Sequence, residues 1–399
     1  MNSYTETSTR LSRGHIGALD GVRGLAILLV LMYHFGGSAK ALGIQSKVLA
    51  VSGLGWCGVD LFFVLSGFLI TGILYDSCNE SRYFLNFYAR RTLRIFPLYY
   101  GALVLVLALR DFWPGAGIWG SANPLWQVFY LTNVIIALKG PSASGIVAHY
   151  WSLAVEEHFY LVWPLLIYYC TRRQMMTISF LLVVVALVLR IALVIGGVDK
   201  VAVYVLTLTR MDDLAVGSLC GLAIRGPDGL AGVMRQARWA VFLAGGCFVL
   251  MVALRRTAHE LDPVLQMFGY SLIAIACGGG LLLCVGSAVL ARLLNAGGLR
   301  WFGRYSYSLY VWHPIINMIL LHSTLTAYLL SDDGGSRIAL LVTSFIACLL
   351  VSFLSFHLWE SRFLALKRFF TSQEHVPTLG RHPAAIGVAR QGDASSLTR

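Results

Sequence analysis

The first long apolar segment of the sequence carries two residues, Arg23 and His34, whose types and spacing suit acid–base chemistry. They lie eleven positions apart, about three helical turns, so both side chains fall on the same helical face. An imidazole, with an ordinary pKa of roughly 6.5, accepts a proton from an attacking hydroxyl at neutral pH. His34 is therefore a candidate catalytic base, and a histidine that only links helices through a hydrogen bond is the alternative.

The second apolar segment contains GVDLFFVLSGF at residues 58–68, with Asp60 and Ser66 among apolar side chains and glycines. A carboxylate in such a segment has a partner, so Asp60 either orients His34, as in a catalytic triad, or pairs with an arginine. No base neighbours Ser66 in sequence. We interpret Ser66 as a packing or hydrogen-bonding residue, with a covalent nucleophile as the weaker alternative.

A third motif, YARRTLRIFP at residues 88–97, places Arg91 and Arg94 one helical turn apart. Residues at this spacing share a helix face, and two planar guanidinium groups side by side suit bidentate contact with phosphate. Anchoring against anionic lipid is the alternative, and it explains the charge but not the spacing.

A fourth motif, HYWSLAVEEHFY at residues 149–160, contains the adjacent carboxylates Glu156 and Glu157. Neighbouring residues diverge by about 100° around a helix. We therefore expect only one of the two carboxylates to face the interior. A solvated glutamate within an interfacial belt of aromatic residues is the alternative.

Two further motifs, RMDD at residues 210–213 and WFGRYSYSLYVWHP at residues 301–314, add polar residues to apolar segments. Arg210 and Asp213 are spaced to neutralise each other, which is a structural interpretation. His313 precedes a proline that loosens a helix locally, and we assign it a structural or substrate-pocket role. Asp212 and Tyr305 are, with Ser66, the remaining candidates for a substrate pocket.

The composition shows which elements must position these residues. The chain of 399 residues is 57% hydrophobic and 13% charged, far less charged than an ordinary soluble domain. Apolar runs of roughly 17 to 25 residues, enough to cross a hydrocarbon core, recur along it. The predicted fold is all-α and polytopic, with about ten transmembrane helices at residues 16–35, 56–75, 95–112, 150–171, 177–196, 201–224, 239–254, 264–291, 305–325 and 337–358.

An eleventh apolar stretch, residues 125–138, is too short to span a bilayer and is predicted to be re-entrant or interfacial. With ten spans and a cytoplasmic N-terminus, more than twice as many Lys and Arg residues lie inside as outside, whereas an eleventh crossing would reverse this excess. Both termini are therefore predicted to be cytoplasmic. The basic residues cluster in these short loops rather than on a soluble face, which argues against nucleic-acid binding despite a net charge of +12.

The predicted organisation is one membrane domain, residues 16–365, between two cytoplasmic tails. Residues 1–15 are polar and lead into the first span without a cleavage site for a signal peptide. Residues 366–399 are predicted to be a second tail, largely disordered because they lack apolar periodicity. Seven of the eight cysteines lie in or beside apolar spans, so neither a disulfide framework nor a metal site is predicted.

The order and spacing of these motifs resemble the membrane-bound acyltransferase-3 family of integral membrane O-acyltransferases. The resemblance covers roughly residues 15–365, and one departure follows the last span, where family members often read Glu-x-Pro-Phe and this chain reads ESRF at residues 360–363. The matching segments are LDGVRGLAILLVLMYHF, GVDLFFVLSGFLI, FYARRTLRIFPLYY, HYWSLAVEEHFYLVWP, RMDDLAVG and FGRYSYSLYVWHP.

The resemblance implies an enzyme of the inner (plasma) membrane that transfers an acyl group from cytoplasmic acyl-CoA, in the first instance acetyl-CoA, to a hydroxyl. The implied acceptor is a sugar of a surface polysaccharide, a glycolipid or a glycosylated natural product. Residue by residue, it implies that His34 is the catalytic histidine, acting as a base or carrying the acyl group, and that Arg23 is paired with it. Arg91 and Arg94 match the coenzyme-contacting arginines, and Glu156, with Glu157 as the weaker alternative, matches the glutamate of the fourth span. Asp60 and Ser66 match the second-span motif.

Two other classes of protein fit the residues without this resemblance. A transporter of a polar substrate also places buried Arg, Asp, Glu and His in a helical bundle, and it would produce flux without acyl transfer. An inactive scaffold for lipid or polysaccharide would tolerate the loss of His34. The lipid bilayer is an expected partner in every case.

Overall fold

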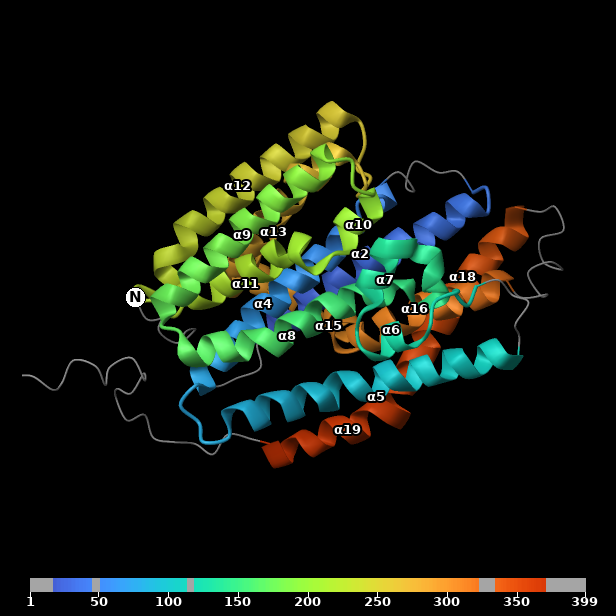
Figure 1. The fold of residues 1–399 in the computed structure, drawn as a ribbon, viewed down its shortest axis with the longest axis horizontal. Helices are drawn as coiled ribbons and strands as arrows, with labels where there is room; N and C mark the ends of the chain where they lie inside the picture. The colour runs from blue at the N-terminus through green and yellow to red at the C-terminus, as the bar shows by residue number, and fades with distance from the viewer. Residues whose placement is uncertain (1–16, 45–50, 113–117, 323–333, 371–399) are drawn as a thin grey trace, which may run out of the picture.

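The computed structural model describes residues 17–44, 51–112, 118–322 and 334–370, and within these ranges it contains helices and no strand (Figure 1). Within the same ranges, 7 helices are long and apolar enough to cross a membrane. They are α2 (Gly17–Ala41), α4 (Cys57–Ser77), α5 (Tyr83–Phe112), α9 (Arg172–Ile195), α12 (Gly229–Arg255), the helix Leu265–Gly286 and the helix Gly335–Phe370.

Helices also cover the three other predicted spans, but these are shorter or interrupted. The elements concerned are α8 (Trp151–Tyr169), α10 (Lys200–Val205) followed by η4 (Thr207–Thr209) and α11 (Met211–Ala223), and α16 (Ser306–His322). The chain is therefore an all-α, polytopic membrane protein. Ten crossings remain a prediction.

The remaining helical elements are short turns and the parts of the two composite helices. The first composite helix contains η5 (Leu265–Gly269), a π turn, and α13 (Tyr270–Gly286). The second contains α18 (Gly334–Ser355), the π turn η6 (Phe356–Glu360), α19 (Ser361–Ala365) and η7 (Leu366–Phe370). The others are α6 (Leu125–Val128), α7 (Thr132–Lys139), η2 (Pro141–Ala143), η3 (Gly145–Tyr150), α14 (Ala288–Leu294) and α15 (Gly297–Arg304).

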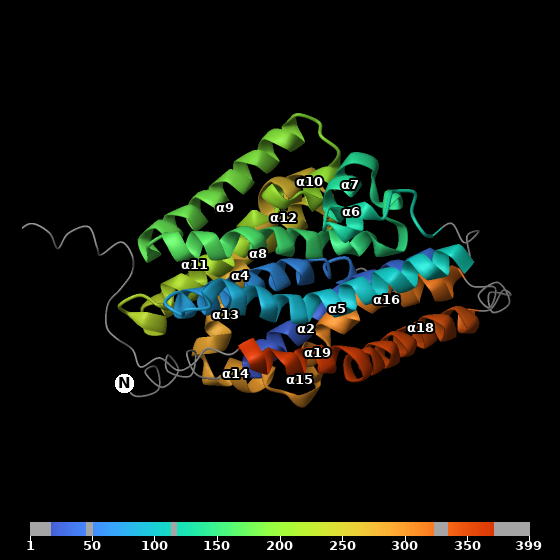
Figure 2. The same cartoon turned by 60° about the horizontal axis from the view of Figure 1, so that its bottom comes forward.

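Helix α4 lies at the centre of the bundle, packed against α2, α8, α11 and α13. In Figure 1 it runs between α9 and α12 on one side and α5 and α19 on the other, and Figure 2 shows α5 close to α16 and α19. Most of α4 is buried, whereas α9 and α12 expose large apolar side chains such as Phe180 and Phe242. A continuous apolar surface of this kind fits contact with lipid rather than with water.

The packing of α4 on α11 depends on two glycines. A Cβ atom at Gly67 would lie 2.0 Å from the carbonyl oxygen of Leu214, and one at Gly217 would lie 2.0 Å from the carbonyl oxygen of Val64. Small residues let the backbones of two membrane helices approach closely. Gly67 of the second predicted span therefore lets α4 lie directly against the backbone of α11.

The predicted span at residues 201–224 is not one continuous helix. The backbone is extended at Leu206, and α11 begins only after Arg210. The break frees the carbonyl oxygen of Thr209, which accepts a hydrogen bond of 2.5 Å from the guanidinium group of Arg190. A helix can break inside a membrane protein where side chains satisfy the freed backbone groups, and periodicity alone does not reveal such partners.

The short apolar stretch at residues 125–138 forms two helices, α6 and α7, neither of them long enough to cross a bilayer. Its backbone is satisfied from α5, where Tyr99 donates to the carbonyl oxygen of Gln127 at 2.7 Å and Tyr100 donates to that of Val128 at 2.9 Å. This arrangement agrees with the predicted re-entrant or interfacial segment.

The predicted tails lie almost wholly outside the described residues. The N-terminal tail, residues 1–15, is not described, and neither are residues 371–399. The C-terminal tail was predicted to begin at residue 366, but η7 continues the last helical run to Phe370. The third helix likewise begins at Tyr83 rather than at residue 95, so Arg91 and Arg94 lie within α5.

Candidate functional site

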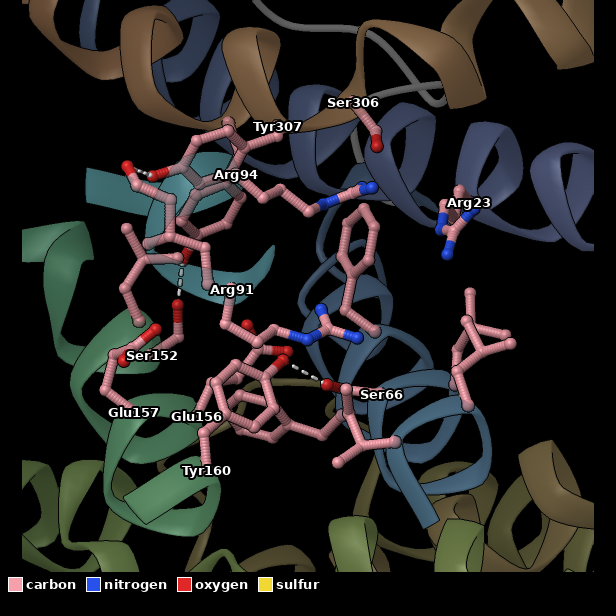
Figure 3. A pocket seen from close by; sticks show the side chains of 18 of the residues that line it. Arg23, Ser66, Arg91, Arg94, Ser152, Glu156, Glu157, Tyr160, Ser306 and Tyr307 are labelled. Atoms are coloured by element: carbon pink, nitrogen blue, oxygen red, sulfur yellow. Dashed lines mark hydrogen bonds between the residues drawn. The ribbon is translucent and has the colours of Figure 1, made fainter. Parts of the chain in front are cut away.

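Three arginines predicted to contact an acyl donor meet in the structure. Arg23 on α2 and both Arg91 and Arg94 on α5 line two adjoining cavities, which share these three residues and Leu69. We call them the inner cavity, of about 110 Å³, and the outer cavity, of about 1140 Å³. Figure 3 shows the three guanidinium groups directed toward the same space, with Ser66 and Tyr160 beside it.

The outer cavity is strongly cationic. Its lining contains seven basic side chains and only two acidic ones, Asp20 and Glu80. Asp20 pairs with Arg23 at 2.9 Å, and among the described residues no salt bridge is formed by Arg91 or Arg94. Besides the three shared arginines, the basic residues are Arg90, Arg300, Arg304 and Lys367.

No site role was predicted for these four additional cations. They were predicted only as part of the cytoplasmic positive charge, since Arg300 and Arg304 precede the ninth span and Lys367 follows the tenth. Arg90 lies on α5 itself, and the packing of α15 on α2 and of η7 on α5 brings the other three to the same cavity. The sequence therefore indicated an excess of positive charge, but not that these side chains line one cavity.

The inner cavity is lined by oxygen-bearing and aromatic side chains from α4, α8 and α16. Ser66 and Tyr160 are hydrogen-bonded to each other, and the guanidinium carbon of Arg91 lies 5.2 Å from the centre of the Tyr160 ring. Cation–π contact of this kind holds an arginine without neutralising it. Other polar residues of this lining are Ser152, Glu156, Glu157, Ser306, Tyr307 and Tyr310.

Both Glu156 and Glu157 line the inner cavity, so the prediction that only one of them faces the interior is wrong. Adjacent residues do diverge on a helix, but a cavity that follows the helix surface between α4, α5 and α16 is wide enough to meet two neighbouring positions. Glu156 shares its helix face with Ser152 and Tyr160, which are one turn away on either side.

His34 does not line either of these two cavities. Its Nδ1 lies 2.9 Å from the carbonyl oxygen of Val30, and its ring is 4.7 Å from that of His313. The ring of His313 is in turn 5.7 Å from Tyr310, which lines the inner cavity. The arginines and His34, which the resemblance assigns to one reaction, do not line a common cavity, because Tyr310 and His313 from α16 lie between them. A common helix face could not predict this, because α16 fills the space.

Asp60 and Asp212 lie in a separate cluster of buried charges. Asp60 accepts a hydrogen bond from Arg210 at 2.7 Å, so of the two predicted alternatives the structure has the arginine pair. Arg210 also pairs with Asp213 at 3.1 Å, which confirms the predicted self-neutralising pair. Asp212 binds Arg190 at 2.7 Å. We call these five residues the ion-pair cluster; none of them lines the inner or the outer cavity.

The last two candidates for the substrate pocket lie apart from each other. Tyr305 lines the outer cavity, and its hydroxyl is 2.9 Å from Nε2 of His357. His313 is fully buried beside His34. Within the described residues, no group of His, Cys, Asp and Glu side chains is arranged to hold a metal ion.

The fold and these cavities define a multi-pass membrane protein with a cationic cavity that leads to a smaller polar one. The family model for the acyltransferase domain Acyl_transf_3 matches residues 16–357. The chain therefore belongs to this acyltransferase family.

The chain is similar in sequence to several bacterial proteins, of which three are described here. The chain is 32% identical to the peptidoglycan O-acetyltransferase OatA of Listeria monocytogenes over 78% of its own length and 51% of that protein. It is 30% identical to the putative peptidoglycan O-acetyltransferase YrhL of Bacillus subtilis, over 76% and 49% of the two chains. It is 29% identical to the O-acetyltransferase OatA of Staphylococcus aureus, over 76% and 51%. The chain thus matches about half the length of these relatives. No solved structure matches it significantly.

Proposed function

We propose that this chain is a membrane O-acetyltransferase that takes an acetyl group from acetyl-CoA on the cytoplasmic side and passes it to a hydroxyl of a cell-wall sugar. The observation that carries the proposal is the continuity of the two cavities at Arg23, Arg91 and Arg94. The proposed topology has ten spans with both termini in the cytoplasm, which places the outer cavity on the cytoplasmic side.

The outer cavity suits the phosphate groups of coenzyme A. Arg91 and Arg94 form no salt bridge within the described residues, and Arg300 and Arg304 add positive charge around them. Bidentate arginine–phosphate contacts combine charge with geometry. The inner cavity, narrow and partly apolar, suits the uncharged pantetheine arm and the acetyl thioester.

His34 has the tautomer that a general base requires. A carbonyl oxygen only accepts hydrogen bonds, so the contact of Nδ1 with Val30 places the proton on Nδ1 and leaves a lone pair on Nε2. In the proposed reaction, Nε2 takes the proton of the acceptor hydroxyl while that oxygen attacks the thioester carbon. For the two groups to meet, the side chain of Tyr310 has to turn away from the space between the inner cavity and His313.

The sugar acceptor is proposed from the relatives, because two of them are named as peptidoglycan O-acetyltransferases. An enzyme that acetylates a wall sugar leaves an ester on the product, whereas a transporter leaves none.

The test uses the protein purified into lipid nanodiscs, with radiolabelled acetyl-CoA and muropeptides from digested peptidoglycan. We expect labelled esters from the wild type and a loss of at least about 100-fold for His34→Ala, the range that a general base contributes. His259→Ala, at an exposed loop histidine, is the matched control and should be fully active. Wild-type turnover by His34→Ala would refute the role of His34. Ester-free muropeptides with active acetylation of another sugar would refute the acceptor.

A further inference from the structure

Three histidines from distant parts of the chain form one group. His34 comes from α2, His149 from η3 and His313 from α16. The ring centres of His34 and His313 are 4.7 Å apart, and those of His149 and His313 are 5.7 Å apart. His313 is therefore the middle member, and its ring is in direct contact with that of His34.

Backbone carbonyl groups fix the tautomer of each ring. Nδ1 of His34 lies 2.9 Å from the carbonyl oxygen of Val30, and Nδ1 of His313 lies 2.9 Å from that of Leu309. Nε2 of His149 lies 3.2 Å from the carbonyl oxygen of Val311. Because a carbonyl oxygen cannot donate, each of these nitrogens carries the proton. Every ring in the group thus keeps one nitrogen with a free lone pair.

His149 and His313 each have one ring nitrogen that is buried and has no hydrogen-bond partner. Nε2 of His313 and Nδ1 of His149 form no hydrogen bond, and His313 is completely buried. A buried acceptor without a donor is destabilising, and such groups in native structures call for an explanation, a catalytic role among them. The donor that would satisfy His313 has to come from its neighbours.

We propose that His313 is a positioning residue for His34: its free Nε2 accepts a hydrogen bond from the N–H that His34 gains when it takes the proton of the acceptor. This inference rests on the function proposed above. A neutral His34 has no second N–H to donate, so the hydrogen bond forms only in the protonated state. Charge-assisted hydrogen bonds are about twice as strong as neutral ones, so the contact stabilises the state that catalysis needs.

In the proposed reaction, each bond that breaks is matched by one that forms, and the proton returns to the leaving group. The acceptor O–H bond breaks and its proton moves to Nε2 of His34; once the acceptor oxygen has left Nε2 for the acetyl carbon, the new N–H turns to Nε2 of His313. The acceptor oxygen bonds to the acetyl carbon, the carbon–sulfur bond breaks, and the thiolate of coenzyme A leaves with the electron pair. The thiolate then takes the proton from His34, and both rings return to their neutral tautomers.

Two conservative substitutions separate this role from a structural one. His313→Gln places an amide oxygen near the former Nε2 and so keeps an acceptor toward His34. His313→Asn places an amide nitrogen near the former Nδ1 and so keeps only the hydrogen bond to Leu309. With acetyl-CoA and muropeptides, we expect His313→Gln to retain kcat within about tenfold and His313→Asn to lose about 100-fold or more, the scale of an assisted proton transfer. The KM for acetyl-CoA should change in neither.

The matched control is His322→Asn. His322 lies on the same helix, makes the same kind of Nδ1 contact with a carbonyl oxygen at 3.0 Å and is exposed, so its replacement should leave kcat unchanged. Rescue by Asn rather than Gln, or loss of coenzyme A binding in both His313 variants, would assign His313 to packing and overturn the inference. If the wild type and His34→Ala were equally active, or neither transferred acetyl groups, the proposed function itself would fail.

Discussion

The protein holds two groups of arginines that differ in their exposure and in their salt bridges. In the ion-pair cluster, Arg190 and Arg210 are completely buried and contact carboxylates at 2.7 Å. Around the two cavities, Arg91 and Arg94 are partly exposed and form no salt bridge within the described residues. A buried charge alone therefore does not indicate a binding site. A cation that forms a salt bridge within the protein joins helices, and one that forms none can bind an anion.

The ion-pair cluster connects four helices. Arg190 lies on α9, Asp60 on α4 and Asp212 on α11, and Ser271 of α13 donates to Asp212 at 2.6 Å. The guanidinium carbon of Arg210 also lies 4.3 Å from the ring centre of Tyr270. The helices that carry this cluster include α4, which forms one wall of the inner cavity through Ser66. The cluster therefore supports the site without contacting it.

The largest effect is expected from Arg210→Met, which leaves Asp60 and Asp213 without their partner. Removal of one member of a buried ion pair costs about 3–5 kcal/mol, whereas neutral replacement of all members costs little. We expect the single variant to lose most of its stably folded protein, measured by size exclusion after heating in detergent. The triple variant Arg210→Met, Asp60→Asn, Asp213→Asn should recover much of it. Equal stability of the single variant and the wild type would remove the distinction between the two groups.

A smaller and different effect is expected from Arg91→Gln. Loss of one charged hydrogen bond, about 1.5–3 kcal/mol, should raise the Kd for coenzyme A by roughly 10–100-fold, measured by titration calorimetry in nanodiscs. The thermal stability should not fall, because no carboxylate is left without its partner. Arg82→Gln, an exposed arginine just before α5 that lines neither cavity, is the control. An unchanged Kd would contradict the assignment of the outer cavity to the coenzyme.

The smallest effect is expected from Arg300→Gln, since this outer-cavity residue is exposed and solvent screens its interaction with phosphate. We expect the Kd for coenzyme A to rise about two- to fivefold at low salt, in keeping with the 0–1 kcal/mol of exposed ion pairs. At high ionic strength the difference should shrink because the Debye length shortens. Arg292→Gln, exposed on α14 and outside both cavities, should have no effect at any salt concentration. A larger effect from Arg292 than from Arg300 would show that only net charge matters.

Much of the helical architecture could be predicted from the sequence, because a bilayer requires long apolar helices and leaves few alternatives. Every predicted span contains helix, and residues 125–138 form short helices as their length requires. The break before α11 could not be predicted, since it depends on Arg190, a side chain from another helix, reaching the carbonyl oxygen of Thr209. Local periodicity does not contain such tertiary partners.

The residues of the candidate site could be predicted from the sequence, but which of them lie next to each other could not. The spacing of Arg91 and Arg94 indicated a shared face, and both line the same cavities. The position of Tyr310 between the inner cavity and the histidines depends on how α16 packs against α2 and η3. Ser306 and Tyr307 lie one helical turn before Tyr310 and share its helix face, but a single sequence does not say which helix that face meets.

The contact of Gly67 with the backbone of α11 limits how the inner cavity of this chain can be enlarged. Ser66, next to Gly67, is held at a fixed depth because α4 can move neither closer to α11 nor, without opening a gap, away from it. The position of α4 is set by backbone contact, whereas Tyr160, Tyr307 and Tyr310 reach the cavity through side chains that substitution can shorten. A larger inner cavity would therefore evolve through these tyrosines, with the position of α4 left unchanged.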